Sequence, residues 1–245
     1  MPTEVMTMLK AEGGGVFVDY TVGAGGHTRK LLETGADQVL GFDRDADALK
    51  EAARNLHHWR DSVELVHSDF RQFVNALNDR GIQSIDGALA DLGVSTMQLD
   101  GHGRGFSFRK DEPLDMRMDR SVGPTAAEML SRVSESDLAD VIYRFGEDRH
   151  ARRIARLFVS TRDRTEVKTT GQLAEVVRRA VARRGYQRID PATRTFQAVR
   201  IWVNREVEGL DEWLFAVCRR LKAGARFAVL TFHSLEDRVV KHTFR

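Results

Sequence analysis

Four aspartates stand at or just beyond the ends of apolar segments, where their side chains could bind a ligand. Asp19, Asp43 and Asp91 close segments of strand-like sequence, and Asp69 follows another by two residues. In open α/β sheets, ligands bind beyond the carboxyl ends of the strands. Carboxylates there can accept hydrogen bonds from ribose hydroxyls. Any one of these acids could equally cap a helix, so it is their joint occurrence that favours a ligand site.

A glycine cluster follows the first acid and strengthens the case for a nucleoside ligand. Gly23, Gly25 and Gly26 lie between a short apolar strand and a predicted helix, an arrangement that lets a backbone approach a ligand closely. The dinucleotide pattern G-x-G-x-x-G would require glycine where Thr28 stands. A nicotinamide-dependent oxidoreductase is therefore the weaker alternative. Asp43 has a spacing suited to ribose hydroxyls, and Phe70 is a candidate for stacking on adenine.

The elements that would position these residues alternate between strand and helix. Strands are predicted at 16–19, 38–43, 63–67 and 85–92, with helices at 28–34, 45–56 and 70–79 between them. This alternation is typical of a doubly wound α/β fold with a parallel sheet. Residues 93–119 show no period. Helices are then expected at 125–130, 135–145, 149–161, 170–184 and 196–221, the last with an interruption at Gly209, before a final strand at 226–232.

The composition narrows the class of protein. No apolar run reaches the roughly 18–20 residues of a membrane span, and the first residues lack a signal-peptide pattern. Cys218 is the one cysteine, so no internal disulfide can form; we expect it to be a buried thiol within an apolar helix. Cysteine and histidine show no zinc spacing, and no metal is expected.

Positive charge is concentrated in the helical part of the chain. Residues 144–200 contain fifteen Arg or Lys against six Asp or Glu, although the whole chain has a net charge of only +2. Arginines at i, i+3, i+4 and i+7 share one face of a predicted helix, and further pairs follow: Arg149, Arg152, Arg153 and Arg156, then Arg178, Arg179, Arg183 and Arg184. Such a surface fits an anionic polymer, or it is simply a solvated helical face.

Longer motifs after the fourth predicted strand indicate a family far more specifically than the glycine loop does. They read Asp91-Leu-Gly-Val-Ser-Thr-Met-Gln98, then Arg104-Gly-Phe-Ser-Phe and Pro113-Leu-Asp-Met-Arg-Met-Asp119. Later words are Phe145-Gly-Glu-Asp-Arg-His and Phe232-His-Ser-Leu-Glu-Asp. Together they resemble the RsmH/MraW family, whose members methylate the N4 amine of a cytidine in small-subunit ribosomal RNA with S-adenosyl-L-methionine. The resemblance spans almost the whole chain.

The resemblance implies a Rossmann-like class I methyltransferase sheet with an inserted helical domain. We expect a discontinuous methyltransferase domain at 1–119 and 195–245, and a basic insertion at 120–194 that recognises rRNA or an assembling small subunit. The family's cofactor contacts fall on Gly25, Gly26, His27, Asp43, Phe70, Asp91 and Gln98.

Methylation of the amine needs a group that orients it and takes its proton. Candidate catalytic residues are Asp91, Asp115 and Asp119, although Asp115 and Asp119 could instead pair with Arg117 or Arg109. Phe106 or Phe108 could stack on an extruded base, or could pack within the loop.

Some features depart from the family pattern. The chain begins after the family's usual opening word and stops at Arg245, where relatives continue, and Glu112 replaces a glycine. A truncated, weakly active or inactive homologue that binds rRNA during ribosome assembly is therefore the alternative function. Several words resemble the mitochondrial branch slightly more than the bacterial one, so the expected location is intracellular and soluble, with the mitochondrial matrix favoured. The oligomeric state is not predicted.

Overall fold

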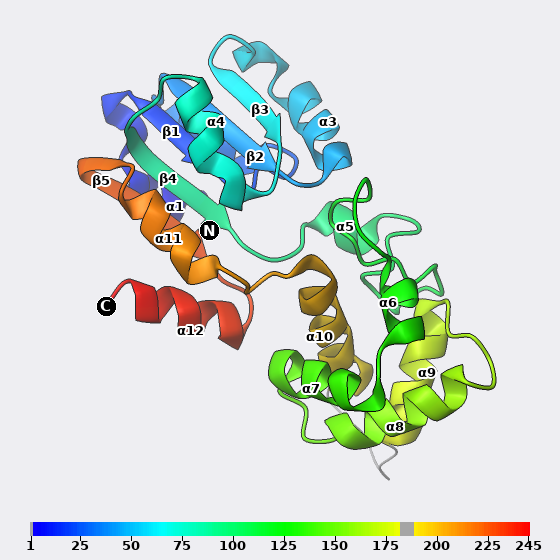
Figure 1. Ribbon diagram of the computed structural model, residues 1–245. Coiled ribbons are helices and arrows are strands. Elements are labelled where there is room, and N and C mark those ends of the chain that lie inside the picture. The colour runs from blue at the N-terminus through cyan, green and yellow to red at the C-terminus, as the bar shows by residue number, and fades with distance from the viewer. Residues whose placement is uncertain (1, 182–188) are drawn as a thin grey trace. The chain divides into compact units, whose positions relative to one another are not determined.

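The computed structural model describes residues 2–181 and 189–245, which form two compact units (Figure 1). The first, called here the sheet unit, comprises Met1–Gly93 and Val207–Arg245, and the second, the helical unit, comprises Val94–Glu206. The division expected from sequence placed 94–119 and 195–206 with the sheet, whereas by packing these segments belong to the helical unit. Each unit is described by itself.

A five-stranded parallel sheet organises the sheet unit. Its strands are β1 (Val16–Asp19), β2 (Gln38–Asp43), β3 (Val63–His67), β4 (Ile85–Asp91) and β5 (Leu221–Leu230), in the order β3-β2-β1-β4-β5. The order reverses beside β1, because the chain first builds outward through β2 and β3 and then returns to add β4 and β5. Ligands bind at such a switch point, beyond the carboxyl ends of the strands. The α/β, Rossmann-like fold predicted from sequence is confirmed.

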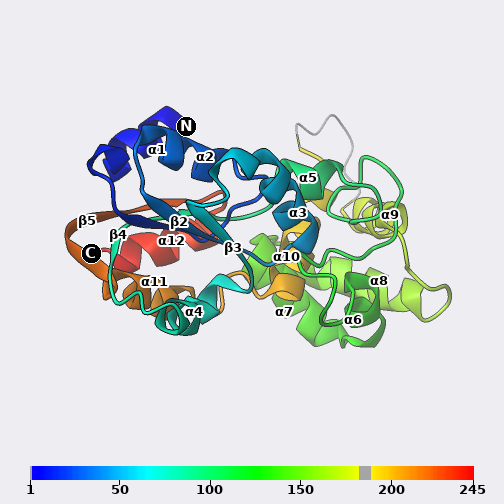
Figure 2. The same cartoon turned by 90° about the horizontal axis from the view of Figure 1, so that it is seen from above.

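Helices cover both faces of the sheet, as Figure 2 shows. One face packs against α1 (Pro2–Leu9), α2 (Gly26–Thr34) and α3 (Ala46–Asn55). The other packs against α4 (Phe73–Asp79), α11 (Leu210–Cys218) and α12 (Ser234–Thr243). Successive strand residues point to opposite faces, so Phe17 enters one core and Val18 the other.

The helical unit has a separate hydrophobic core. Its elements are α5 (Thr96–Asp100), α6 (Ala126–Arg132), α7 (Glu135–Gly146), α8 (Ala151–Arg162), α9 (Thr170–Ala180) and α10 (Ala192–Asn204). Ile142, Ile154, Phe158 and Val177 are among the side chains buried in that core. In α6 to α10, apolar residues at helical spacing supply one buried stripe per helix, which is why these five helices could be predicted from sequence.

Some elements differ from those predicted. The short helices α1, α5 and α12 were not predicted, and β5 begins five residues before the expected strand. Cys218 is exposed, so the prediction of a buried thiol is wrong: α11 buries Trp213, Leu214 and Val217, and Cys218 falls outside that stripe. Within the part of the chain that the structure describes, no helix is long and apolar enough to cross a membrane.

Candidate active site

Asp19 holds the glycine loop at the carboxyl end of β1. Its side chain is fully buried, and its two oxygens accept hydrogen bonds from the Thr28 hydroxyl (2.7 Å) and the Thr21 backbone amide (3.0 Å). Burial raises the pKa of Asp19 to about 6, although these two hydrogen bonds work in the opposite direction. The Asp19 carboxylate binds Thr21 at the start of the loop and Thr28 in the first turn of α2. It therefore fixes the shape of the loop between them.

The glycines supply the backbone conformations of the turn. Gly23 and Gly25 have φ of 55° and 87°, and Gly25 caps α2. An added Cβ on Gly23 or Gly26 would meet no described atom within 4 Å, so open space lies beside the loop. The predicted nucleoside site requires such space beside the loop.

Asp43, at the end of β2, ties the loop to the neighbouring strand. One carboxylate oxygen accepts from the Gly23 amide and the other from the Asp45 amide, both at 2.8 Å. Burial raises the pKa of Asp43 above its ordinary value. Each carboxylate oxygen has a second lone pair, so Asp43 can still accept from a ligand hydroxyl.

His27 and Asp91 form a pair where α2 begins and β4 ends. His27 Nε2 lies 3.4 Å from Asp91 Oδ2, and the hydrogen bond to Asp91 raises the pKa of His27. The backbone amide of Asp91 donates to the Thr21 hydroxyl at 2.7 Å. Asp91 Oδ1 and His27 Nδ1 are shielded from solvent without a hydrogen-bond partner among the described residues. Unsatisfied polar atoms of this kind call for an explanation, and both lie where the sequence predicts a ligand.

Phe70 lies beyond β3 and is held by its neighbours. Its ring centroid is 4.4 Å from that of Trp213, and the guanidinium groups of Arg44 and Arg71 lie 5.9 and 5.3 Å from the ring. Asp69 pairs with both arginines. The predicted stack on adenine is therefore confined to the part of the ring that these groups leave uncovered.

Gln98 lies in the helical unit, where it is buried in α5. Its Oε1 accepts from the Ser95 amide while the Ser95 hydroxyl accepts from the Gln98 amide, which is a capping box. The structure thus gives Gln98 a local role in shaping α5, and its predicted contact with the cofactor is not tested.

Asp115 is an ion-paired, buried carboxylate of the helical unit. Arg117 donates to both of its oxygens (2.7 and 3.0 Å), and Arg120 lies 3.5 Å away. Burial acts to raise the pKa of Asp115, but the hydrogen bonds from Arg117 outweigh it and the pKa is lowered. A carboxylate with a lowered pKa is a poor proton acceptor. This geometry matches the alternative prediction of pairing with Arg117.

Asp119 accepts hydrogen bonds from the amide and hydroxyl of Ser121 at a turn. The segment around Asp119 is fixed from within the helical unit: the Arg104 guanidinium donates to the carbonyls of Arg117 and Met118, and the Asn204 amide group bonds Met116 and Met118. Met116 is buried with φ of 60°. The irregular stretch is therefore an ordered structure and not a loose loop.

The two phenylalanines proposed to stack on a base are packing residues. Phe106 is 7% exposed and belongs to the core of the helical unit. The ring of Phe108 lies 4.8 Å from that of Phe196. Glu112 does not have a positive φ, and its backbone bonds Thr170 in both directions, so replacement of a glycine there introduces no strain.

One of the four arginines predicted to share a basic face at α8 is paired with an acid at the surface. Arg156 pairs with Glu135, and Arg162 donates to the carbonyls of Leu130 and Val133. Arg149, Arg152 and Arg153 are exposed and have no ion pair within the described residues. On α9, Arg178 is engaged by Asp190. Arg183 and Arg184 lie outside the described residues.

Sequence reasoning missed the threonines that shape the site. Thr21 and Thr28 position Asp91 and Asp19, yet neither residue type indicates a ligand contact. The one available signal was their place, two and nine residues after a buried acid at a strand end.

The sequence matches known proteins along its whole length. The family model described as the MraW methylase family matches residues 1–245. A "Ribosomal RNA small subunit methyltransferase H" from Geotalea uraniireducens is 47% identical over 248 aligned positions, which cover 100% of this chain and 80% of the relative. The protein of that name from Sorangium cellulosum is 49% identical over 242 positions, covering 99% of this chain and 77% of the relative.

A solved rRNA methylase from Streptococcus thermophilus is a weaker likeness, with a TM-score of 0.33 and 23% identity over 38% of this chain and 55% of that chain. At that level the fold assignment depends on the sheet order given above. The relatives in sequence are bacterial, so the expected mitochondrial branch is not supported. The match over residues 1–245 and the identity to these relatives show that this chain belongs to the MraW methylase family.

Proposed function

We propose that the protein transfers a methyl group from S-adenosyl-L-methionine to the N4 amine of a cytidine in small-subunit ribosomal RNA. Its relatives are named as small-subunit rRNA methyltransferases, and the chain covers about four-fifths of their length. The observation that carries the proposal is the His27–Asp91 pair beside the glycine loop, with one polar atom of each residue shielded and unsatisfied.

The residues of the sheet unit fit the cofactor. The open space at Gly23 and Gly26 admits a ligand, and Asp43 retains lone pairs for ribose hydroxyls. His27 Nδ1 offers a further polar contact. We assign cofactor contacts to Gly25, Gly26, His27, Asp43, Phe70, Asp91 and Gln98, as the family resemblance implies. When bound, the cofactor supplies an electrophilic methyl group on a sulfonium.

Asp91 is the best candidate for the group that receives the amine. In the reaction the sulfur–methyl bond breaks as a nitrogen–methyl bond forms, and the nitrogen loses a proton, which the Asp91 carboxylate can accept. Asp91 Oδ1 can accept the amine's hydrogen bond and align it for attack. Among the three predicted catalytic acids, Asp115 is ion-paired and Asp119 caps a turn, so we rank both below Asp91.

The helical unit is proposed to bind rRNA through the unpaired arginines at the start of α8. Arg149, Arg152 and Arg153 are exposed there, and arginines that neutralise phosphates bind nucleic acid with little dependence on sequence. This assigns the basic insertion its predicted role, with a smaller surface than first expected.

Two measurements test the proposed function. Calorimetry should detect S-adenosylhomocysteine binding that weakens roughly tenfold or more in Asp43→Asn, since a hydrogen bond to a charged group is lost. Asp37→Asn, at an exposed carboxylate, is the matched control and should bind normally.

Small-subunit rRNA from a bacterium lacking its own enzyme of this family should gain N4-methylcytidine when incubated with the protein, as detected by nucleoside mass spectrometry. Binding of rRNA and S-adenosylhomocysteine without methyl transfer would instead support the inactive homologue.

A further inference from the structure

An exposed aromatic ring lies at the carboxyl end of the sheet, next to the strand that ends in Asp91. Phe232 follows β5 by two residues and is 65% exposed. A large apolar side chain that remains in water is common as a scattered residue, but beside a candidate site it is a candidate ligand contact.

The position of Phe232 is fixed by its pairing with β4. Asp91 is in register with Leu230, and the Leu92 amide donates to the Leu230 carbonyl at 3.0 Å. An added Cβ on Gly93 would lie 3.3 Å from Phe232 Cδ2 and 3.7 Å from its Cγ. The ring therefore lies against the backbone of Gly93, two residues beyond Asp91, a separation that an extended chain spans in roughly 7 Å.

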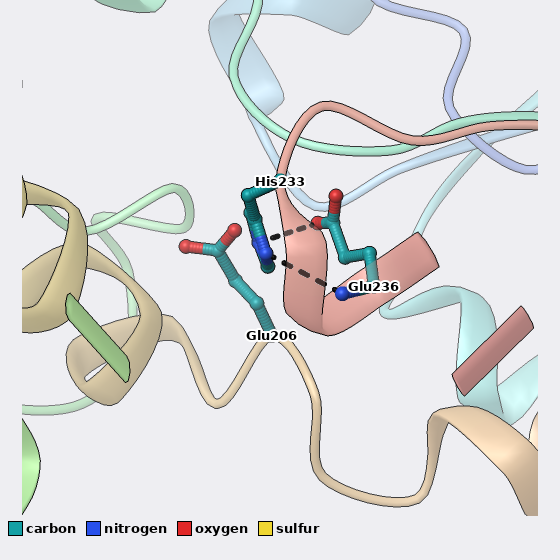
Figure 3. Close-up of side chains that lie close together, drawn as sticks. All are labelled: Glu206, His233 and Glu236. Atoms are coloured by element: carbon teal, nitrogen blue, oxygen red, sulfur yellow. Dashed lines mark hydrogen bonds and ion pairs between the residues drawn. The ribbon is translucent and has the colours of Figure 1, made fainter. Parts of the chain in front are cut away.

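A buried polar pair holds the turn that presents this ring. His233 and Glu236 stand at the start of α12 (Figure 3). Their side chains are only 6% and 2% exposed. His233 Nε2 lies 3.1 Å from Glu236 Oε1, and His233 Nδ1 accepts from the Glu236 amide. Glu236 Oε2 in turn accepts from the Phe232 backbone amide at 3.2 Å. The turn is thus anchored in the protein while the ring it carries faces solvent.

The proposed substrate offers a ligand for this ring. A cytosine presents an aromatic face and an exocyclic amine at its edge. Asp91 Oδ1 is an acceptor without a partner, which suits the amine. A base that stacks on an aromatic side chain gains affinity through its face and leaves its edge free for hydrogen bonds.

We infer that Phe232 is the platform on which the target cytosine stacks, with its amine directed toward Asp91. The inference rests on the proposed function. Phe232 takes the place of Phe106 and Phe108 as the ring that stacks on the base, because those two rings pack within the helical unit. His233 and Glu236 act as positioning residues for the turn.

Substitutions at position 232 test the inference on the full chain. Phe232→Ala should lower the rate constant kcat/KM for methylation of small-subunit rRNA by roughly 5- to 150-fold, the range measured for loss of one base–aromatic stack. Affinity for S-adenosylhomocysteine should stay within twofold of the unsubstituted protein. Phe232→Tyr should remain near full activity, whereas Phe232→Leu, apolar but not aromatic, should resemble the alanine variant.

Phe215→Ala is the matched control, because Phe215 is an exposed phenylalanine of the sheet unit on α11. It should leave both measurements unchanged. The inference is overturned if Phe232→Ala methylates rRNA within twofold of normal, if the leucine and tyrosine variants are equal, or if Phe232→Ala loses S-adenosylhomocysteine binding. Failure of the unsubstituted protein to methylate rRNA at all would instead refute the proposed function, and the platform with it.

Discussion

Asp19→Asn should stabilise the sheet unit at neutral pH, and the size of the effect follows from the structure. The carboxyl is fully buried, and burial raises its pKa to about 6, against the ordinary value of 3.8 that applies when the chain is unfolded. Each pKa unit of difference is worth about 1.4 kcal/mol, so the ionised carboxylate lowers the free energy of unfolding by about 3 kcal/mol above pH 6.

The direction of the pH dependence follows from proton binding. Between about pH 4 and pH 6 the folded chain binds more protons at Asp19 than the unfolded chain does, so stability from this group falls as pH rises through that window. Asparagine does not titrate, and its amide can still accept from the Thr21 amide and donate to the Thr28 hydroxyl. The variant should therefore gain about 3 kcal/mol over the unsubstituted protein between pH 4 and pH 7.

Urea unfolding followed by tryptophan fluorescence measures this gain. Trp213 packs against Tyr20 in the sheet unit, so a background with Trp59 and Trp202 replaced by Phe reports on that unit. Asp37→Asn, at an exposed acid, serves as the control and should show no such gain. Parallel pH profiles for Asp19→Asn and the parent, or a variant less stable at pH 7 than at pH 4 relative to the parent, would refute the reasoning.

Three further predictions concern the same two units. Asp91→Asn should lower the pKa of His27, because the hydrogen bond that raises this pKa is weakened. A ¹H–¹⁵N NMR titration of the imidazole measures the pKa. An unchanged value would contradict the pairing of His27 with Asp91. Thr21→Val should leave the Asp91 amide without its acceptor, which should cost about 1–3 kcal/mol of stability and weaken S-adenosylhomocysteine binding. Urea unfolding measures the stability and calorimetry the affinity. Unchanged values of both would show that Thr21 has no part in the site. Arg162→Met should destabilise the helical unit by about 1.5–3 kcal/mol, because two carbonyls lose their hydrogen-bond donor. Arg152→Gln should leave stability unchanged but weaken rRNA binding and make it less dependent on salt. The opposite pattern in thermal unfolding and filter-binding assays would show that the two arginines have been assigned the wrong roles.

Local sequence was sufficient for the sheet and its ligand-binding edge. β1, β2 and β3 have the bounds expected from their apolar runs, and the acids at the strand ends followed from the same runs. Apolar strand runs and the glycines that end an element involve only neighbouring residues, so both can be recognised in the sequence. The short helix α5 could not be identified in this way, because it is defined by a capping box and not by an apolar stripe.

Other features of the structure depend on partners distant in the chain. The segment in which Asp115 pairs with Arg117 is fixed by Asn204 from 86 or more residues away, and Arg162 donates to carbonyls about 30 residues distant. Which arginines remain exposed, and which phenylalanine faces solvent, follow from such contacts.

The sequence by itself determined the family, the parallel α/β fold and the acids that border the site, because each of these is indicated by short motifs of adjacent residues. Only the tertiary structure decided that Asp91 retains an unsatisfied oxygen while Asp115 does not, and that Phe232 rather than Phe106 faces solvent. The physical reason is that burial and hydrogen-bond partnership are properties of the packed chain.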